Sequence, residues 1–146
     1  MKFKKAYIVF IILFIILLAF IVKYKKSHFG IEPVLNGNEI LFKFSRDDVT
    51  VFDYQIKNLE DPKFEYKTVF DSGEVNKNLK EIRIENFQSK NIKPNHAYFL
   101  TLSRSGLSGE QGVALSSLGF CFNNKTMIRQ LSDEGSMYFI DKCHKL

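Results

Sequence analysis

A chain of 146 residues is long enough for one small domain and a membrane anchor, but too short for two full domains. Hydrophobic residues make up 45% of it, which excludes a disordered tail, and 15 Phe and 6 Tyr favour strands. Six of the 21 basic residues lie in residues 1–26 and all 16 acidic residues follow, so the formal charge of +5 belongs to the N-terminal segment. The remainder has no basic excess, which argues against nucleic-acid binding.

Residues 1–26 are predicted to be an N-terminal membrane anchor with basic flanks. Ala6 to Val22 is a run of 17 uncharged, mostly apolar residues. As a helix it would span roughly 25 Å, close to the ~30 Å thickness of a hydrocarbon core. Lysines on both sides can reach the lipid headgroups. A cleaved signal peptide is the alternative, although no A-x-A cleavage pattern follows the run.

The two cysteines bear on which side of the membrane the domain lies. Three lysines precede the apolar run and three follow it, so the positive-inside rule does not decide the orientation. Cys121 and Cys143 invite a disulfide, which persists only in an oxidising compartment. Two separate buried thiols are the alternative, and with His144 alone they are too few for a zinc site. We therefore expect a single-pass protein of a bacterial inner membrane, with residues 27–146 forming a domain in the periplasm.

From residue 31 the apolar pattern has a period of two, with turn residues about every ten positions, which predicts an all-β domain. Asn36-Gly37 between two apolar runs predicts a hairpin in which both of these residues have positive φ. No segment after residue 26 keeps a helical period for three turns. Seven or eight short strands therefore predict a β-sandwich. The main expected strands are residues 39–44, 49–56, 64–70, 79–87, 99–102, 113–122 and 136–140.

Ile92-x-Pro94-x-x-x-Tyr98 resembles the tyrosine corner of fibronectin type III and related immunoglobulin-like domains. In that motif the tyrosine begins the penultimate strand and its hydroxyl bonds back to the backbone. The resemblance implies a small immunoglobulin-like sandwich, although the chain has no Trp for its core. The glycine-rich loop that follows would lie where such domains often bind partners. Leu107 and Glu110 are therefore candidate partner-binding residues.

No set of residues has the spacing of a catalytic or metal site. His28, His96 and His144 are far apart in the sequence, and neither H-E-x-x-H nor C-x-x-C occurs. Gly106-Leu-Ser-Gly is followed by Glu110, so the G-x-S-x-G motif of hydrolases fails. Neither an enzyme activity nor a metal, cofactor or small-molecule substrate is predicted. Three carboxylate pairs are interpreted as solvated turn residues: Asp47-Asp48, Glu60-Asp61 and Asp133-Glu134.

The overall layout, a short N-terminal membrane segment before one compact β domain with few cysteines, is similar to that of periplasmic immunity proteins of type VI secretion. The stretch from Glu39 to Asp48, followed by Tyr54, resembles an early strand pair in them. The expected function is a non-enzymatic, membrane-anchored module that binds another protein, such as a toxin effector delivered into the periplasm. The alternative is a structural or accessory subunit of a cell-envelope complex.

Overall fold

The computed structural model describes residues 11–18, 30–61, 63, 65–105 and 113–146, and the chain divides into two units, Met1–Gly30 and Ile31–Leu146. In the first unit, residues 11–18 are helical and exposed. No helix within the described residues combines the length and the apolar character that crossing a membrane requires. The predicted anchor, Ala6 to Val22, lies outside the described residues apart from that short helix, so the anchor stays a prediction.

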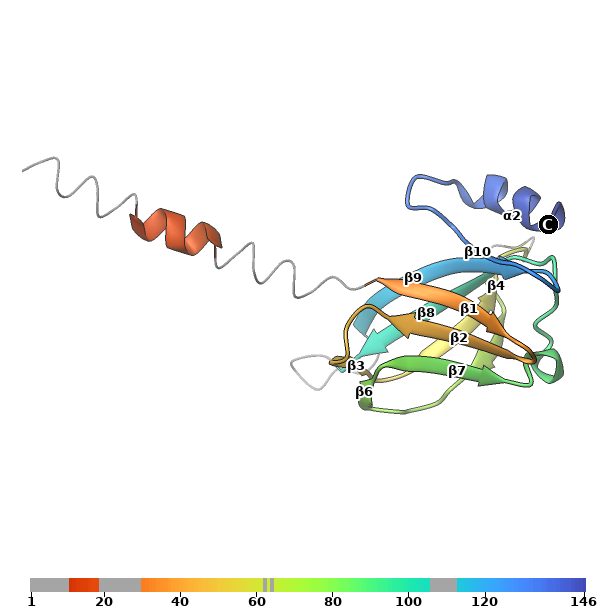
Figure 1. Ribbon diagram of the computed structural model, residues 1–146, viewed down its shortest axis with the longest axis horizontal. Helices are drawn as coiled ribbons and strands as arrows, with labels where there is room; N and C mark the ends of the chain where they lie inside the picture. The colour runs from red at the N-terminus through yellow and green to blue at the C-terminus, as the bar shows by residue number, and fades with distance from the viewer. Residues whose placement is uncertain (1–10, 19–29, 62, 64, 106–112) are drawn as a thin grey trace, which may run out of the picture. The chain divides into compact units, whose positions relative to one another are not determined.

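The second unit is built from antiparallel strands, which confirms the prediction of a sheet-rich, sandwich-like domain (Figure 1). One sheet has the strand order β1-β2-β7, a second has the order β10-β9-β8-β4-β5, and β3 pairs with β6. The elements are β1 (Ile31–Asn36), β2 (Glu39–Phe44), β3 (Val49–Val51), β4 (Tyr54–Asn58), β5 (Thr68–Asp71), β6 (Lys77–Leu79), β7 (Glu81–Glu85), the 3₁₀ helix η1 (Phe87–Lys90), β8 (Tyr98–Arg104), β9 (Val113–Phe122), β10 (Met127–Arg129) and the helix α2 (Ser136–His144).

The two larger sheets face each other across an aromatic and aliphatic core. Phe42 of β2 and Phe120 of β9 are fully buried and meet edge to face, with ring centroids 5.0 Å apart. Each such side chain stabilises the fold by about 1.5–3 kcal/mol when it leaves water. Alternate positions of neighbouring strands complete this core: Ile56 in β4, Ile82 and Ile84 in β7, Leu100 and Leu102 in β8.

The β1–β2 hairpin turns one residue later than predicted. Asn36 pairs with Glu39, so the two-residue loop is Gly37-Asn38 rather than Asn36-Gly37. Of the two predicted turn residues, only Gly37 has a positive φ, 58°. Because strand side chains alternate between faces, this register decides that Ile40 points into the core.

Two predicted strands are shorter than expected. Residues 49–56 divide into β3 and β4 at Phe52, whose N–H donates to the carbonyl of Ser103 in β8 instead of continuing the β3 pairing. The chain thus leaves β6 and joins β8 within a few residues. Residues 64–70 include a strand only from Thr68 onward. Tyr66 has a φ of 43°, a left-handed conformation that interrupts an extended backbone.

The prediction of a last strand at residues 136–140 is wrong, because Ser136–His144 is the helix α2. Phe139 and Cys143, one helical turn apart, are fully buried, whereas Met137 and Tyr138 are exposed. A helix of nine residues is too short to display a clear helical period in the sequence. Figure 1 shows α2 outside the sheet that contains β9 and β10, so the domain has a helical cover at one end.

Candidate functional site

Cys121 and Cys143 form a disulfide, the predicted pairing, which joins β9 to α2 with Cα atoms 5.9 Å apart. Both cysteines are fully buried, and Leu59, Ala97 and Phe139 belong to the same small apolar cluster. In β9, Phe120 points into the sandwich core, so Cys121 points to the opposite face, where α2 covers it. A covalent bond and a second, smaller core thus fix the C-terminal end of α2 on the sheet.

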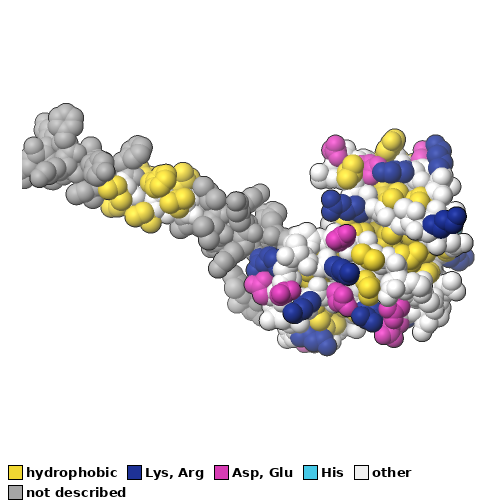
Figure 2. Space-filling model, viewed as in Figure 1, with side chains coloured by type: hydrophobic (Ala, Val, Ile, Leu, Met, Phe, Trp, Pro, Cys, Tyr) yellow, Lys and Arg dark blue, Asp and Glu magenta, His cyan; other side chains and the backbone are white. Residues whose placement is uncertain are grey.

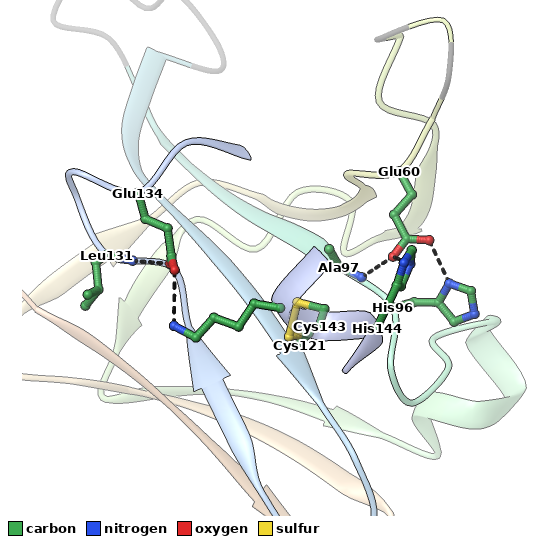
Figure 3. The surroundings of a disulfide bond; sticks show 9 residues. Glu60, His96, Ala97, Cys121, Leu131, Glu134, Cys143 and His144 are labelled. Atoms are coloured by element: carbon green, nitrogen blue, oxygen red, sulfur yellow. Dashed lines mark hydrogen bonds and ion pairs between the residues drawn. A yellow bond between two sulfur atoms is a disulfide. The ribbon is translucent and has the colours of Figure 1, made fainter. Parts of the chain in front are cut away.

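Three side chains with metal-binding atoms meet beside this disulfide: Glu60, His96 and His144 (Figure 3). Glu60 lies in the turn after β4, where its backbone N–H donates to the side-chain oxygen of Asn58 at 2.9 Å. His96 lies two residues before β8 begins. His144 is the last residue of α2 and follows Cys143 directly, so the disulfide holds the backbone next to it on β9.

The carboxylate of Glu60 lies between the two imidazoles. Its Oε2 is 2.8 Å from Nδ1 of His96, and its Oε1 is 3.0 Å from Nε2 of His144. Oε1 also accepts a hydrogen bond of 2.7 Å from the backbone N–H of Ala97. The side chain of Glu60 is only 16% exposed, whereas both histidines are about half exposed. The cluster is therefore a largely buried carboxylate flanked by two imidazoles that reach solvent.

Hydrogen bonding keeps this carboxylate ionised. Burial alone would raise the pKa of Glu60, because a buried charge loses its hydration. The hydrogen bond from Ala97 and the contacts with His96 and His144 act in the opposite direction and outweigh burial, so the pKa of Glu60 is lowered. Glu60 is thus an anion at neutral pH, the form that accepts hydrogen bonds and binds cations.

The sequence conceals this cluster because its members are 36 and 84 residues apart. Strand pairing explains the first meeting. Asn58 lies opposite Tyr98 in the β4–β8 ladder, and the same antiparallel register, continued two residues further, places Glu60 opposite His96. The disulfide explains why His144 lies next to Glu60, since His144 follows a bridged cysteine. The interpretation of Glu60 as a solvated turn residue is therefore wrong.

The same interpretation is wrong for Glu134, whose side chain is only 6% exposed. Its Oε1 lies 3.1 Å from Nζ of Lys142 in α2, and its Oε2 accepts a hydrogen bond of 3.2 Å from the backbone N–H of Leu131 (Figure 3). Glu134 thus links the turn before α2 to the last turn of the helix. Polar contacts of Lys142 and His144 thus hold the last turn of α2 in addition to the disulfide.

Large hydrophobic side chains are exposed on α2 and in the turn before it, among polar ones. Leu131, Met137 and Tyr138 are 52%, 66% and 67% exposed. Figure 2 shows hydrophobic side chains among charged ones at the end of the domain where Figure 1 shows α2. A groove of about 560 Å³ runs beside the helix, and it is lined by Ile128, Tyr138, Asp141, Lys142, Lys145 and Leu146. We refer to Leu131, Met137, Tyr138 and this groove as the α2 face.

Tyr98 begins β8, and its hydroxyl binds the backbone of the turn that precedes it. The hydroxyl accepts a hydrogen bond of 2.7 Å from the N–H of Lys93 and donates to the carbonyl of Asn91 at 3.4 Å. Burial raises the pKa of Tyr98, and the Lys93 hydrogen bond opposes this. Ile92 is fully buried beneath the turn, and Pro94 lies in its exposed part. A tyrosine corner requires this geometry.

The loop residues Leu107 and Glu110 and the histidine His28 lie outside the described residues, so the proposed binding role of the loop stays a prediction. No protein-family model, no curated protein and no solved structure matches the chain.

Proposed function

We propose that this chain is a non-enzymatic protein-binding module, anchored in a membrane by Ala6 to Val22, with a fibronectin type III-like sandwich as its binding domain. The strand order supports the fold. With the β3–β6 pair and the edge strands β5 and β10 set aside, the remaining strands follow the immunoglobulin-like order A-B-E in one sheet and C-F-G in the other. Tyr98 then begins strand F, the position of the tyrosine corner in those domains.

The exposure of the α2 face is the observation that carries the binding function. Methionine and tyrosine are enriched in protein interfaces, and tyrosine often provides much of the binding energy. Met137 and Tyr138 are both about two-thirds exposed on a helix that a disulfide and Glu134 hold in place. A rigid surface loses little conformational entropy when a partner binds. The partner is a protein that offers an apolar anchor to Tyr138 and an acidic group to Lys145.

The disulfide supports a location outside the cytoplasm, because thiols inside the cytoplasm are kept reduced. With the apolar run at residues 6–22, it favours a domain displayed on the periplasmic side of a bacterial inner membrane. The most specific form of the function is an immunity protein, which would bind a toxin effector that arrives in the periplasm and thereby block it. An accessory subunit of an envelope complex would instead hold its partner permanently.

Site-specific photo-crosslinking in living cells tests this function. A photoreactive phenylalanine analogue replaces Tyr138, and the same analogue at the exposed β6 residue Lys77 serves as control. We expect a protein adduct from position 138 and none from position 77. A third position, Leu107, tests the loop that the sequence suggested as a partner site. Adducts of equal yield from 77 and 138, or no adduct from 138 and 107, would contradict the proposed function.

The partner identified in this way provides the quantitative measurement. Tyr138→Ala should weaken its binding by about 2 kcal/mol or more, roughly thirtyfold, if Tyr138 is a central anchor. Lys77→Ala should leave the affinity unchanged. Protection of cells from the partner when both are directed to the periplasm would identify an immunity protein. A partner that is harmless and stays bound through membrane solubilisation would identify an envelope subunit.

A further inference from the structure

We propose that Glu60, His96 and His144 form a binding site for a zinc-like divalent transition-metal ion at the surface of the domain. The proposal is independent of the protein-binding function, because its residues are not part of the α2 face. Two imidazoles and one carboxylate are the protein ligands of many open zinc sites, in which a fourth position remains available to water or another ligand. This cluster provides that donor set from three separate segments of the chain.

The donor atoms are close to the spacing that a tetrahedral ion needs. Glu60, His96 and His144 each provide one donor atom, and these three atoms all lie within 4.8 Å of one another. Ligands about 2.0–2.2 Å from a tetrahedral zinc ion are roughly 3.4 Å apart. The present distances, 2.8 Å from Oε2 to Nδ1 of His96 and 3.0 Å from Oε1 to Nε2 of His144, would therefore have to widen by about half an ångström.

The surroundings of Glu60, His96 and His144 favour the binding of a cation. The backbone N–H of Ala97 donates to Oε1 of Glu60, which is the kind of outer contact that orients a metal-binding carboxylate. His144 ends α2, and the C-terminus of a helix carries a partial negative charge that attracts cations. The adjacent disulfide restrains the backbone at the end of α2, from which the side chain of His144 extends toward Glu60.

The donor types also indicate which ions the site excludes. Mg²⁺ and Ca²⁺ prefer shells made entirely of oxygen atoms, and a site with two imidazoles offers them a single carboxylate. Zn²⁺, Cu²⁺ and Ni²⁺ all accept imidazole nitrogen together with carboxylate oxygen. The half-exposed histidines let an ion enter directly from solvent. The site would cross-link the turn after β4, the turn before β8 and the end of α2.

Zinc titration of the full chain in detergent, purified without a histidine tag, tests the proposal. We expect saturable binding of one Zn²⁺ per chain that excess Mg²⁺ or Ca²⁺ does not displace. The single variants His96→Gln, His144→Gln and Glu60→Gln should each weaken binding by at least about tenfold, as loss of a metal contact does elsewhere. His28→Gln is the matched control and should bind like the unaltered chain. Circular dichroism in the presence of a chelator establishes that each variant is folded.

Histidine footprinting gives a second readout that needs no variant. Diethyl pyrocarbonate modifies accessible imidazoles, and peptide mass spectrometry reports each histidine separately. Zn²⁺ should protect His96 and His144 together, with one midpoint, and should leave the modification of His28 unchanged. The proposal is overturned if the unaltered chain fails to bind Zn²⁺, if the double variant His96→Gln/His144→Gln binds it equally well, or if protection does not include both histidines.

Discussion

The hydroxyl of Tyr98 accepts a hydrogen bond from the backbone N–H of Lys93, five residues earlier, at 2.7 Å. The contact closes the turn that leads from η1 into β8, the strand in the middle of the five-stranded sheet. Because Tyr98 is buried against Phe120, with ring centroids 5.8 Å apart, its hydroxyl is held in place by the core itself. One side chain thus connects the packing of the sandwich to the path of a surface turn.

Removal of that hydroxyl should destabilise the domain. Tyr98→Phe keeps the ring in the core but leaves the N–H of Lys93 without this acceptor, at a cost of about 1–3 kcal/mol in the free energy of unfolding. Urea denaturation measures the change. Tyr138→Phe, which removes a hydroxyl from an exposed ring, should stay within about 0.5 kcal/mol of the unaltered chain. Equal stability of the two variants would show that the corner contact contributes nothing.

The Cys121–Cys143 bridge should contribute strongly to stability. It closes a loop with a sequence separation of 22, for which chain entropy gives roughly 3 kcal/mol. The double variant Cys121→Ala/Cys143→Ala should lose about that amount, measured against the oxidised chain by urea denaturation. Intact mass measured without reductant should show the loss of two hydrogens from the unaltered chain. Two thiols that react freely with an alkylating reagent would contradict the bridge.

Glu134 should matter although it lies in a surface turn. Glu134→Gln removes the charge that Lys142 faces and weakens the acceptor for the N–H of Leu131. We expect a loss of about 1–2 kcal/mol in unfolding free energy, because the largely buried side chain of Glu134 loses its charge-assisted contacts. The neighbouring Asp133→Asn is the matched control, since Asp133 is exposed, and it should change stability by less than about 0.5 kcal/mol. Hydrogen exchange of the α2 amides should accelerate in the first variant alone.

Reporter fusions test the expected topology. Alkaline phosphatase joined after Leu146 should be active, because this enzyme needs disulfides and folds outside the cytoplasm. Green fluorescent protein at the same position, exported through the general secretory route, should remain dark. A bright fluorescent fusion together with an inactive phosphatase would place the domain in the cytoplasm and remove the support for a periplasmic partner.

Local patterns in the sequence predict much of the fold. The alternation of Ile40 and Phe42 identifies a strand, because one face of a sandwich strand is buried. Tyr98 after a proline turn identifies the start of β8. The helix α2 could not be predicted in the same way. Its identity depends on tertiary contacts of Phe139 and Cys143 with the sheet, and nine residues contain too few turns to reveal the helical period.

The candidate metal cluster could not be predicted from spacing either. Glu60 and His96 meet only because β4 and β8 pair with Asn58 opposite Tyr98, and a one-residue shift of that register would separate them. His144 joins them only because its neighbour is bridged to β9. Motif searches read neighbours along the chain, whereas this site is a product of strand register and a cross-link. A sequence reading that paired the strands first would place residues 60 and 96 together.

The disulfide also changes what a protease could do to this domain. Residues 122–142 lie within a covalent ring closed by Cys121 and Cys143, and the ring contains β10, the exposed Leu131 and most of α2. A single cut at the accessible turn around Leu131 opens the ring but releases no fragment, because both new ends remain attached to β9. The helix with Met137 and Tyr138 could leave only after a second cut within the ring, or after reduction of the disulfide in the nicked chain. In a compartment rich in proteases, the domain can thus be nicked in this turn and still keep its helix.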